Sequence, residues 1–394
     1  FKQKTAYEIR LSLVGSEMCI RDSFGTKGTR TMRVLVMGGT QFNGLALVHD
    51  LANTGHQVVI LNRGKSEAKL PLGVERVYAD RTKPDQMRDV LRSVDVDAVI
   101  DVTAYRPEEV ELMVEIFRGR IEHYVFISST VIYAASDLLP ITESHPVERG
   151  PAQQEYGRNK LLCEDILLRE WRENRFPAST VCFSMVMGAG NILPDREQRM
   201  FQRLLRGRPI LIPGNGRMLQ QIGHADDQAR ALRMMLCNPK TYGQRYNLTG
   251  GDYFTQEGYV DTFARILARP AEKVFISPAL MNDLWEGRVE IEMPPTQSKV
   301  DIRGKDKASR VMLSRFMLTM LVQQIAPNIH YWDRSAIYSV DKLKRHTGWE
   351  PELDFPRSVE RTWRWYQAEG LDKSQEFDFG FEDELAKLVR ERAR

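Results

Sequence analysis

The stretch RVLVMGGTQFNG, at residues 33–44, holds a short apolar run that ends directly in a glycine-rich turn. An apolar run of about five residues bounded by glycine is typical of a buried β-strand. Helical spacing of the apolar residues follows at Ala46–Thr54, so the turn joins a strand to a helix. Such a turn directs backbone N–H groups and a helix N-terminus at one point, which is the arrangement that binds a pyrophosphate.

Strand and helix patterns alternate beyond this stretch. Apolar runs typical of strands lie at 57–61, 75–78, 98–102, 124–128 and 180–183. Helix patterns begin at Lys83 and occupy 107–117 and 153–174. Because alternation requires crossover connections, it predicts a parallel sheet covered by helices on both faces. We expect an α/β fold, a Rossmann-like doubly wound sheet with a smaller C-terminal substrate-binding lobe.

The end of the alternation sets the expected domain boundaries. Residues 32–190 should form the NAD(P)-binding domain, and the chain should return to the sheet near 221–224 and 246–248. Residues 191–370 should form mainly the substrate-binding lobe. The last segment, 371–394, should end in a charged surface helix.

The charge balance disfavours a nucleic-acid partner. Residues 1–31 show no sustained helix or strand period, and we expect a non-native, unpacked leader before a natural start at Met32. The whole chain has 56 Lys and Arg against 53 Asp and Glu. The leader holds six of these bases and three of these acids, so the rest is neutral. Nucleic-acid binding needs clustered positive charge.

Composition indicates a cytoplasmic protein. No apolar run reaches the ~18 residues of a membrane-spanning helix, so we expect no membrane association. The four cysteines lie far apart without a Cys-x-x-Cys pair, which is typical of reduced thiols. The seven histidines show no metal-ligand spacing, and we therefore expect no metal.

The glycine turn is the predicted cofactor cradle. A Gly-x-x-Gly-x-x-Gly pattern would place glycine at 38, 41 and 44, and position 41 is glutamine. A tight turn without a ligand is the alternative, but the position between a first strand and a first helix favours phosphate binding. The predicted cradle residues are Gly38, Gly39, Thr40, Gln41, Phe42 and Gly44.

Residues after the second, third and fourth strands should complete the cofactor site. Asn62 and Arg63 end the second strand where an acidic residue would bind the ribose hydroxyls of NAD. An arginine suits a 2′-phosphate, so NADP is favoured over NAD, with a solvated basic turn as the alternative. Asp80 could accept from the adenine amino group or cap the next segment. Thr103 and Tyr105 should line the nicotinamide site or serve loop structure.

Tyr156 and Lys160 are the strongest candidates for catalysis. A spacing of four puts both side chains on one face of a helix. The free tyrosine pKa near ~10 is too high for proton transfer at neutral pH, and a nearby lysine cation would lower it. Ser129, at the end of a central strand, would hold the substrate oxygen, and Lys160 could also bind the nicotinamide ribose. Core packing of the Tyr-x-x-x-Lys pair is the alternative.

These residues and several others carry a family resemblance. From Met32 to about Gln367 the chain resembles the extended short-chain dehydrogenase/reductase superfamily, the NAD(P)-dependent epimerase/dehydratase group. The supporting motifs are Ser129 four residues before Tyr133, Tyr156/Lys160, Ile212-Pro213-Gly214-Asn215-Gly216, His224-Ala225-Asp226-Asp227, Tyr246-Asn247-Leu248 and Gly348-Trp349-Glu350-Pro351. The Gly-Gly-x-x-x-x-Gly turn is similar to an atypical subgroup that keeps serine, tyrosine and lysine but lacks an upstream asparagine. The helix pattern at 107–117 also lacks asparagine.

The resemblance implies a reaction and excludes others. Tyr156 would exchange a proton with a substrate hydroxyl while nicotinamide C4 exchanges hydride at the same carbon. The pair Thr130-Val131 stands where 4,6-dehydratases look to need Asp-Glu and decarboxylating relatives a glutamate, so both activities are disfavoured. Gln220 stands where relatives that grip a nucleotide diphosphate carry arginine, which disfavours nucleotide sugars. The expected substrate contacts are Thr130, Tyr133, Asn191, Arg217 and Gln220.

Three hypotheses follow. The first is an NAD(P)-dependent epimerase, dehydrogenase or reductase acting on a sugar-like or other small substrate, and related enzymes imply a possible homodimer. The second is an RNA-binding protein of the chloroplast stem-loop-binding type, which the neutral charge and the intact triad disfavour. The third is a non-catalytic sensor that binds NADP.

Overall fold

The computed structural model describes residues 30–193, 196–291, 306–325 and 333–392. The chain divides into two compact units, residues 1–32 and 33–394, and every helix and strand named below belongs to the second. Residues 1–29 of the expected leader lie outside the described residues.

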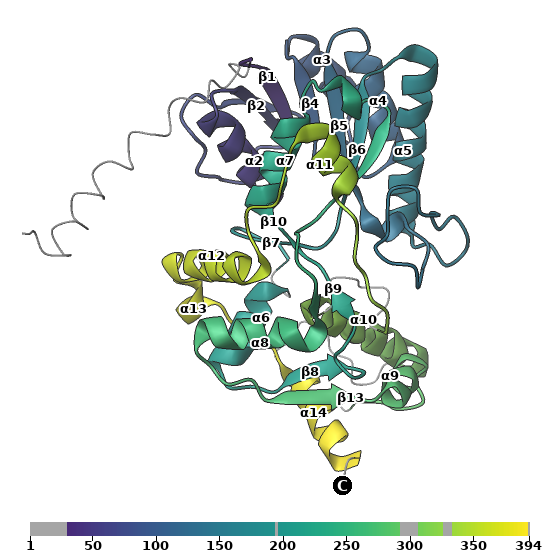
Figure 1. Ribbon diagram of the computed structural model, residues 1–394, viewed down its shortest axis with the longest axis vertical. Helices are drawn as coiled ribbons and strands as arrows, with labels where there is room; N and C mark the ends of the chain where they lie inside the picture. The colour runs from purple at the N-terminus through teal and green to yellow at the C-terminus, as the bar shows by residue number, and fades with distance from the viewer. Residues whose placement is uncertain (1–29, 194–195, 292–305, 326–332, 393–394) are drawn as a thin grey trace, which may run out of the picture. The chain divides into compact units, whose positions relative to one another are not determined.

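A seven-stranded parallel sheet forms the centre of the larger part of this unit, in the order β11-β6-β5-β4-β1-β2-β3 (Figure 1). The strand order reverses between β1 and β4, which is the point where doubly wound sheets bind ligands. The predicted Rossmann-like α/β fold is therefore confirmed. The strands are β1 (Arg33–Met37), β2 (Gln57–Asn62), β3 (Glu75–Tyr78), β4 (Ala98–Asp101), β5 (His123–Ser129), β6 (Ala178–Phe183) and β11 (Gln244–Leu248).

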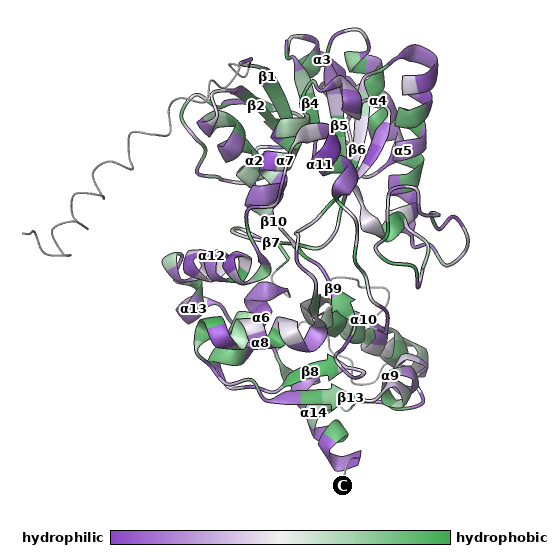
Figure 2. Ribbon diagram, in the orientation of Figure 1, coloured by the Kyte–Doolittle hydropathy of each residue, from purple (hydrophilic) through white to green (hydrophobic). Residues whose placement is uncertain are grey.

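The central strands are buried and mostly apolar because helices cover both faces. All residues of β4 and β6 are buried, and Figure 2 shows the sheet mostly in the hydrophobic colour. Helices α3, α4 and α5 pack side by side, and α2 packs against α7 (Figure 1). The bounds are α2 (Phe42–Asn53), α3 (Pro84–Arg92), α4 (Pro107–Phe117), α5 (Glu155–Asn174) and α7 (Ala225–Met235).

Helix α2 begins earlier than its apolar spacing predicted. The sequence indicated a start at Ala46, whereas the helix starts at Phe42, directly after the turn. Gly44 therefore lies in the first helical turn. The polar and small residues of this turn hid the start, because apolar spacing detects only the part of a helix that packs against a core.

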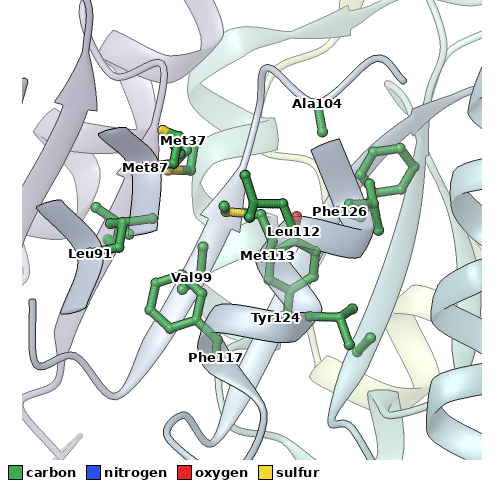
Figure 3. Close-up of a cluster of buried hydrophobic side chains, with 14 of the residues drawn as sticks. Met37, Met87, Leu91, Val99, Ala104, Leu112, Met113, Phe117, Tyr124 and Phe126 are labelled. Carbon is green, nitrogen blue, oxygen red and sulfur yellow. The ribbon is translucent and has the colours of Figure 1, made fainter. Parts of the chain in front are cut away.

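A buried hydrophobic cluster supports the carboxyl ends of β1, β4 and β5 (Figure 3). Met37, Val99 and Phe126 come from these strands, and Met87 and Met113 come from α3 and α4. Each such side chain contributes about 1.5–3 kcal/mol when it is removed from water. The cluster includes Ala104, so it also fixes the base of the loop that follows β4.

Among the described residues, three two-stranded sheets lie outside the main one, β7 with β10, β8 with β13, and β9 with β12. Strand β11 returns to the main sheet by pairing with β6, but β10 does not, so the expected return at 221–224 is wrong. Gly223–His224 pairs with β7 instead, and His224 caps α7 at once, which leaves no length for a longer strand. These strands are β7 (Val186–Met187), β8 (Ile210–Pro213), β9 (Leu219–Gln220), β10 (Gly223–His224), β12 (Phe254–Thr255) and β13 (Lys273–Ile276).

The smaller lobe contains two further apolar clusters. One joins α6, α8 and α12, and the other joins β8, β13, α9, α10 and α14. Although α14 is rich in charge, as the sequence indicated, its Phe381 and Leu385 are buried in the second cluster. No helix in the described part of the chain is long and apolar enough to cross a membrane. The remaining helices are α6 (Glu197–Leu205), α8 (Gln256–Leu267), α9 (Pro278–Trp285), α10 (Lys307–Ile325), α11 (Asp341–Thr347), α12 (Phe355–Ala368), α13 (Leu371–Ser374) and α14 (Gly380–Arg392), with short 3-10 turns η1 (Thr130–Ile132) and η2 (Pro239–Thr241).

Candidate active site

The glycine turn between β1 and α2 brings backbone atoms too close together for side chains. A Cβ atom added at Gly44 would lie 2.2 Å from the carbonyl oxygen of Gly38. Gly38 itself has φ +93°, and a Cβ there would lie 2.2 Å from Cγ2 of Thr103. The turn therefore requires glycine at both positions, and Gly39 lies between them against Ile60 and Val48.

A cleft of about 490 Å³ lies beside this turn at the carboxyl ends of β1, β2 and β3. Seven of its lining residues were predicted to bind the cofactor, Gly38, Thr40, Gln41, Asn62, Arg63, Asp80 and Thr103. The sequence reading missed Lys65, Ser66, Arg81, Thr82 and Glu109, which also line it. Phe42 instead lines a separate cleft on the α2 side, with φ +42°.

The far end of the cleft is basic and anchored by short-range hydrogen bonds. Arg63 and Lys65 are exposed there, and the side chain of Asn62 accepts a hydrogen bond of 2.8 Å from the Gly64 amide. The side chain of Asp80 accepts from the amide and hydroxyl of Thr82, and these bonds lower the pKa of Asp80. Asp80 therefore caps the following turn, which was one of its two predicted roles.

Lys160 is buried at the carboxyl ends of β4 and β5. Its Nζ donates hydrogen bonds of 2.7 Å to the carbonyls of both Ala104 and Ile127. The residue is 5% exposed, and burial lowers its pKa to about 8. An ammonium group has three donors, so one remains beyond these two bonds.

Tyr156 lies on the same face of α5, with Lys160 Nζ 5.7 Å from its ring centroid. The whole residue is 43% exposed, and burial raises the pKa of its phenol. A side-chain hydrogen bond with Ser129 and the charge of Arg196 act in the opposite direction and lower this pKa. Ser129, Tyr156 and Lys160 thus meet at one edge of the sheet.

The lowering of the Tyr156 pKa by Lys160 stays a prediction. Within the structure, the side chains of Ser129 and Arg196 act most strongly to lower it. The ammonium of Lys160 is directed toward two backbone carbonyls. Arg196, at the start of α6, was missed because it is distant in sequence from the Tyr-x-x-x-Lys pair.

The loop after β4 contacts every part of the site. Thr103 packs against Gly38 of the glycine turn, and the carbonyl of Ala104 accepts from Lys160. The ring of Tyr105 stacks on Tyr156, with centroids 5.7 Å apart and planes at 18°. The two residues predicted to line the nicotinamide site, Thr103 and Tyr105, therefore join the glycine turn to the candidate catalytic residues.

Thr130 and Tyr133, two of the five predicted substrate contacts, line one small cavity together with Arg334 and Tyr338. Thr130 also shares a side-chain hydrogen bond with Tyr338, and the hydroxyl of Tyr133 donates a 2.7 Å bond to the Asn247 side chain.

The other three predicted contacts lie apart from that cavity. Asn191 holds the carboxylate of Glu197 through bonds of 2.9 and 3.0 Å. Gln220 is fully buried in β9, and Arg217 is exposed in the loop before it. The substrate role of all five residues stays a prediction. Within the described residues, no group of three His, Cys, Asp or Glu side chains could hold a metal.

Residues 34–249 match the NAD dependent epimerase/dehydratase family. The chain belongs to this family. The match covers the whole parallel sheet from β1 to β11, including the turn and the three candidate catalytic residues. The predicted family resemblance is therefore confirmed.

Three relatives show the range of the family. The chain is 29% identical over 364 residues to the chloroplast stem-loop binding protein of 41 kDa b from Arabidopsis thaliana, covering 88% of this chain and 79% of that one. It is 28% identical over 249 residues to the 2′-dehydrokanamycin reductase of Streptomyces kanamyceticus, covering 62% and 70%. A UDP-glucose 4-epimerase structure from Thermotoga maritima has the same fold, with a TM-score of 0.64, 17% identity, and 86% and 99% coverage.

The residues present fit a dinucleotide of the NAD(P) type. The glycine turn lies between β1 and the N-terminus of α2, where backbone amides can bind a phosphate, and the adjoining cleft ends in two exposed bases. The cleft also reaches Thr103, one residue from the carbonyl that holds Lys160. A ligand that fills it would extend from the basic end toward the candidate catalytic residues.

Proposed function

We propose that this protein is an NADP-dependent oxidoreductase or epimerase that acts at a hydroxyl-bearing or carbonyl carbon of a sugar-like substrate. One observation carries the proposal. The buried Lys160 ammonium and the Tyr156 ring of α5 contact Ala104 and Tyr105 of the loop that also touches the glycine turn. A structural role for the Tyr-x-x-x-Lys pair would not require this contact with a dinucleotide-binding turn.

In the proposed mechanism Tyr156 transfers the proton. Its phenol donates to the carbonyl oxygen of the substrate during reduction and accepts the hydroxyl proton during oxidation. Ser129 binds the same oxygen and shares its hydrogen bond with Tyr156. The bound nicotinamide supplies or takes the hydride. Stabilising the developing phenolate is the task of Ser129 and Arg196, since both lower the pKa of Tyr156.

In this scheme Lys160 positions the loop after β4, and it is not the group that lowers the pKa of Tyr156. Two of its three donors hold the carbonyls of Ala104 and Ile127, which fixes the edge of β5 and the β4 loop. The third donor would bind a ribose hydroxyl of the cofactor, as the sequence predicted. Burial favours the neutral amine, so ligand binding at this donor would also help to retain the proton.

Arg63 and Lys65 support NADP as the cofactor. Both are exposed at the basic end of the cleft, and a 2′-phosphate would gain charge-assisted hydrogen bonds there. The similarity to a 2′-dehydrokanamycin reductase supports reduction of a keto group on an aminoglycoside or related sugar. Epimerisation would require the keto intermediate to be turned over and reduced on its other face.

A cofactor titration followed by a substrate panel tests the proposal. We expect NADPH to raise the melting temperature more than NADH does, and a panel of keto-sugars to oxidise NADPH. Turnover should require Tyr156, as set out in the Discussion. The absence of binding of all four nicotinamide dinucleotides would contradict the proposal, whatever the panel shows.

RNA binding is a second candidate because of one observation. The stem-loop binding protein of Arabidopsis thaliana matches 88% of this chain, a longer match than the reductase gives. The even balance of charge beyond residue 31 opposes it. Salt-titrated binding to a stem-loop RNA distinguishes the two, because phosphate contacts give an affinity that falls steeply with salt.

A further inference from the structure

Four consecutive backbone amides in the loop after β4 donate to only two carboxylates. The amides of Thr103 and Ala104 donate to Asp101 Oδ1 at 3.1 and 2.9 Å. The next two amides, of Tyr105 and Arg106, donate to Glu109 Oε2 at 2.7 and 3.1 Å. The conformation that presents Ala104 to Lys160 and Tyr105 to Tyr156 therefore depends on these two side chains.

One arginine joins both carboxylates. Nη2 of Arg81 donates to Asp101 Oδ2 at 2.5 Å, and Nη1 lies 3.5 Å from Glu109 Oε2. The hydroxyl of Tyr124 donates to the same Asp101 oxygen at 2.7 Å. Asp101 is completely buried, and a buried carboxylate is stable only when it is paired and hydrogen-bonded. Arg81 is its positive partner, so the state of the loop depends on the position of this guanidinium.

Arg81 also belongs to the cofactor cleft. It follows Asp80 at the end of the β3 segment and lines the cleft near Arg63 and Thr82. Its side chain is 13% exposed, and its enclosed Nε atom has no hydrogen-bond partner among the residues that the structure describes. A guanidinium that is not fully hydrogen-bonded can shift when a ligand binds at the cleft wall.

We propose that Arg81 is a positioning residue that couples the adenosine end of the cofactor cleft to Tyr156 through Asp101, Glu109 and the loop between them. The inference rests on the proposed function, since it needs a dinucleotide in the cleft. A ligand beside Arg81 fixes its guanidinium, the guanidinium fixes both carboxylates, and the carboxylates fix residues 103–106. Cofactor binding then orders Tyr105 against Tyr156 before any substrate is bound.

An ion pair on the surface, between Arg88 and Glu115, provides a control for a purely structural role of Arg81. Arg88 and Glu115 join α3 to α4 by bonds of 2.8 and 2.9 Å, whereas Arg81, just before α3, bridges to Glu109 of α4. Arg88 does not line the cofactor cleft, and its side chain bonds Glu115 and Asp85. Arg88→Met is therefore the control for Arg81→Met.

Amide-resolved hydrogen exchange at residues 103–106 tests the proposal, with NADP as the probe. In the wild-type protein NADP should slow these four amides at least fivefold. In Arg81→Met they should exchange at least tenfold faster, and bound NADP should no longer slow them. Arg88→Met should behave as the wild type does.

Two further variants keep the test decisive. Arg81→Lys can satisfy the charge of Asp101 but cannot span both carboxylates, so it should restore protection at 103–104 and not at 105–106. If Arg81→Met alone does not fold, the double variant Arg81→Met/Asp101→Asn removes both charges and keeps an oxygen for the Thr103 and Ala104 amides. That variant should bind NADP without slowing exchange at 105–106.

The outcomes distinguish the two proposals. Wild-type protein that binds no nicotinamide dinucleotide contradicts the proposed function. Wild-type protein that binds NADP, together with Arg81→Met that keeps normal protection and normal slowing at 103–106, overturns the role of Arg81 alone.

Discussion

The sheet domain and the smaller lobe use their polar residues differently. In the sheet domain, most of the predicted cofactor residues line one cleft at the carboxyl ends of neighbouring strands, and Tyr156 and Lys160 of α5 contact the loop after β4. Beyond β6, Asn191 and Gln220 are buried, and Asn191 holds a carboxylate of its own segment. Strand ends of a parallel sheet meet at one edge by geometry, whereas the lobe has no such rule. Because of this difference, we expect substitutions in the two regions to have effects of different sizes.

The largest effect is expected at Tyr156. Tyr156→Phe removes the proton donor and keeps the ring that stacks on Tyr105. General acid–base groups contribute typically ~10²–10⁴-fold, so we expect turnover of the best keto-sugar to fall by about 10³-fold with NADP affinity unchanged. Steady-state kinetics and calorimetric titration measure the two quantities. Tyr253→Phe, at an exposed tyrosine, is the control, and equal activity of both variants would remove the phenol from the mechanism.

Gly44→Ala tests whether the glycine turn binds the cofactor or only supports the fold. The new Cβ would lie 2.2 Å from the carbonyl oxygen of Gly38, so the turn must shift. We expect NADP affinity to fall by at least about 100-fold, because the backbone amides can no longer converge on a phosphate. Gly258→Ala in α8 is the helical control, with its Cβ 3.2 Å from the hydroxyl oxygen of Thr255, a side-chain contact that needs far less displacement than a backbone clash. An alanine variant that binds NADP normally would show that the turn is only structural.

His123 gives the sheet domain an acid-sensitive position. Burial lowers its pKa to about 3, from an ordinary value near ~6.5. Its Nδ1 accepts from the Cys237 amide and Nε2 bonds Ser179, so the folded state needs the neutral ring. Because the unfolded chain then binds the extra proton, the stability present above pH ~6.5 is lost as the pH falls toward 3.

The size of this loss follows from the pKa difference. Between pH 7 and pH 5 the free energy of unfolding should fall by about 2 kcal/mol because of His123. Urea unfolding at both values measures it. His123→Gln should be less stable at pH 7 but should lose that dependence, whereas His49→Gln, at a partly exposed position, should keep it. An unchanged dependence in His123→Gln would assign the acid sensitivity to another group.

The preference for NADP over NAD depends on the exposed Arg63, so replacing this residue should have a smaller effect on cofactor binding than Gly44→Ala has. We expect Arg63→Ser to weaken NADP binding about tenfold, the loss of one charge-assisted contact, and to leave NAD binding unchanged. Calorimetry with both cofactors gives the ratio. Lys69→Ser is the control because Lys69 is exposed and does not line the cleft. If Arg63→Ser weakens the binding of NADP and NAD equally, Arg63 does not bind the 2′-phosphate.

Local patterns predicted the sheet domain because its signals lie close together in sequence. The glycine turn, the end of β5 and the tyrosine–lysine pair on α5 each depend on a strand end or a helical repeat. Arg81, Glu109 and Arg196 were missed because their partners come from other strands and helices. One signal was available for Asp101: an acidic residue inside an otherwise apolar buried strand needs a positive partner. Nothing local identified that partner as Arg81.

The smallest expected effect concerns the smaller lobe. Gln220 is completely buried in β9, and neither side-chain amide atom has a hydrogen-bond partner among the described residues. Replacing an unsatisfied buried amide by an apolar group of similar size removes its desolvation cost, so Gln220→Met should stabilise the protein by about 1 kcal/mol. Urea unfolding measures this change, and Gln154→Met, at an exposed position before α5, is the control. A raised KM for the substrate without added stability would show instead that the amide reaches the ligand. In that case the lobe would present its polar residues to the active site as the sheet domain does, and the contrast between them would fail.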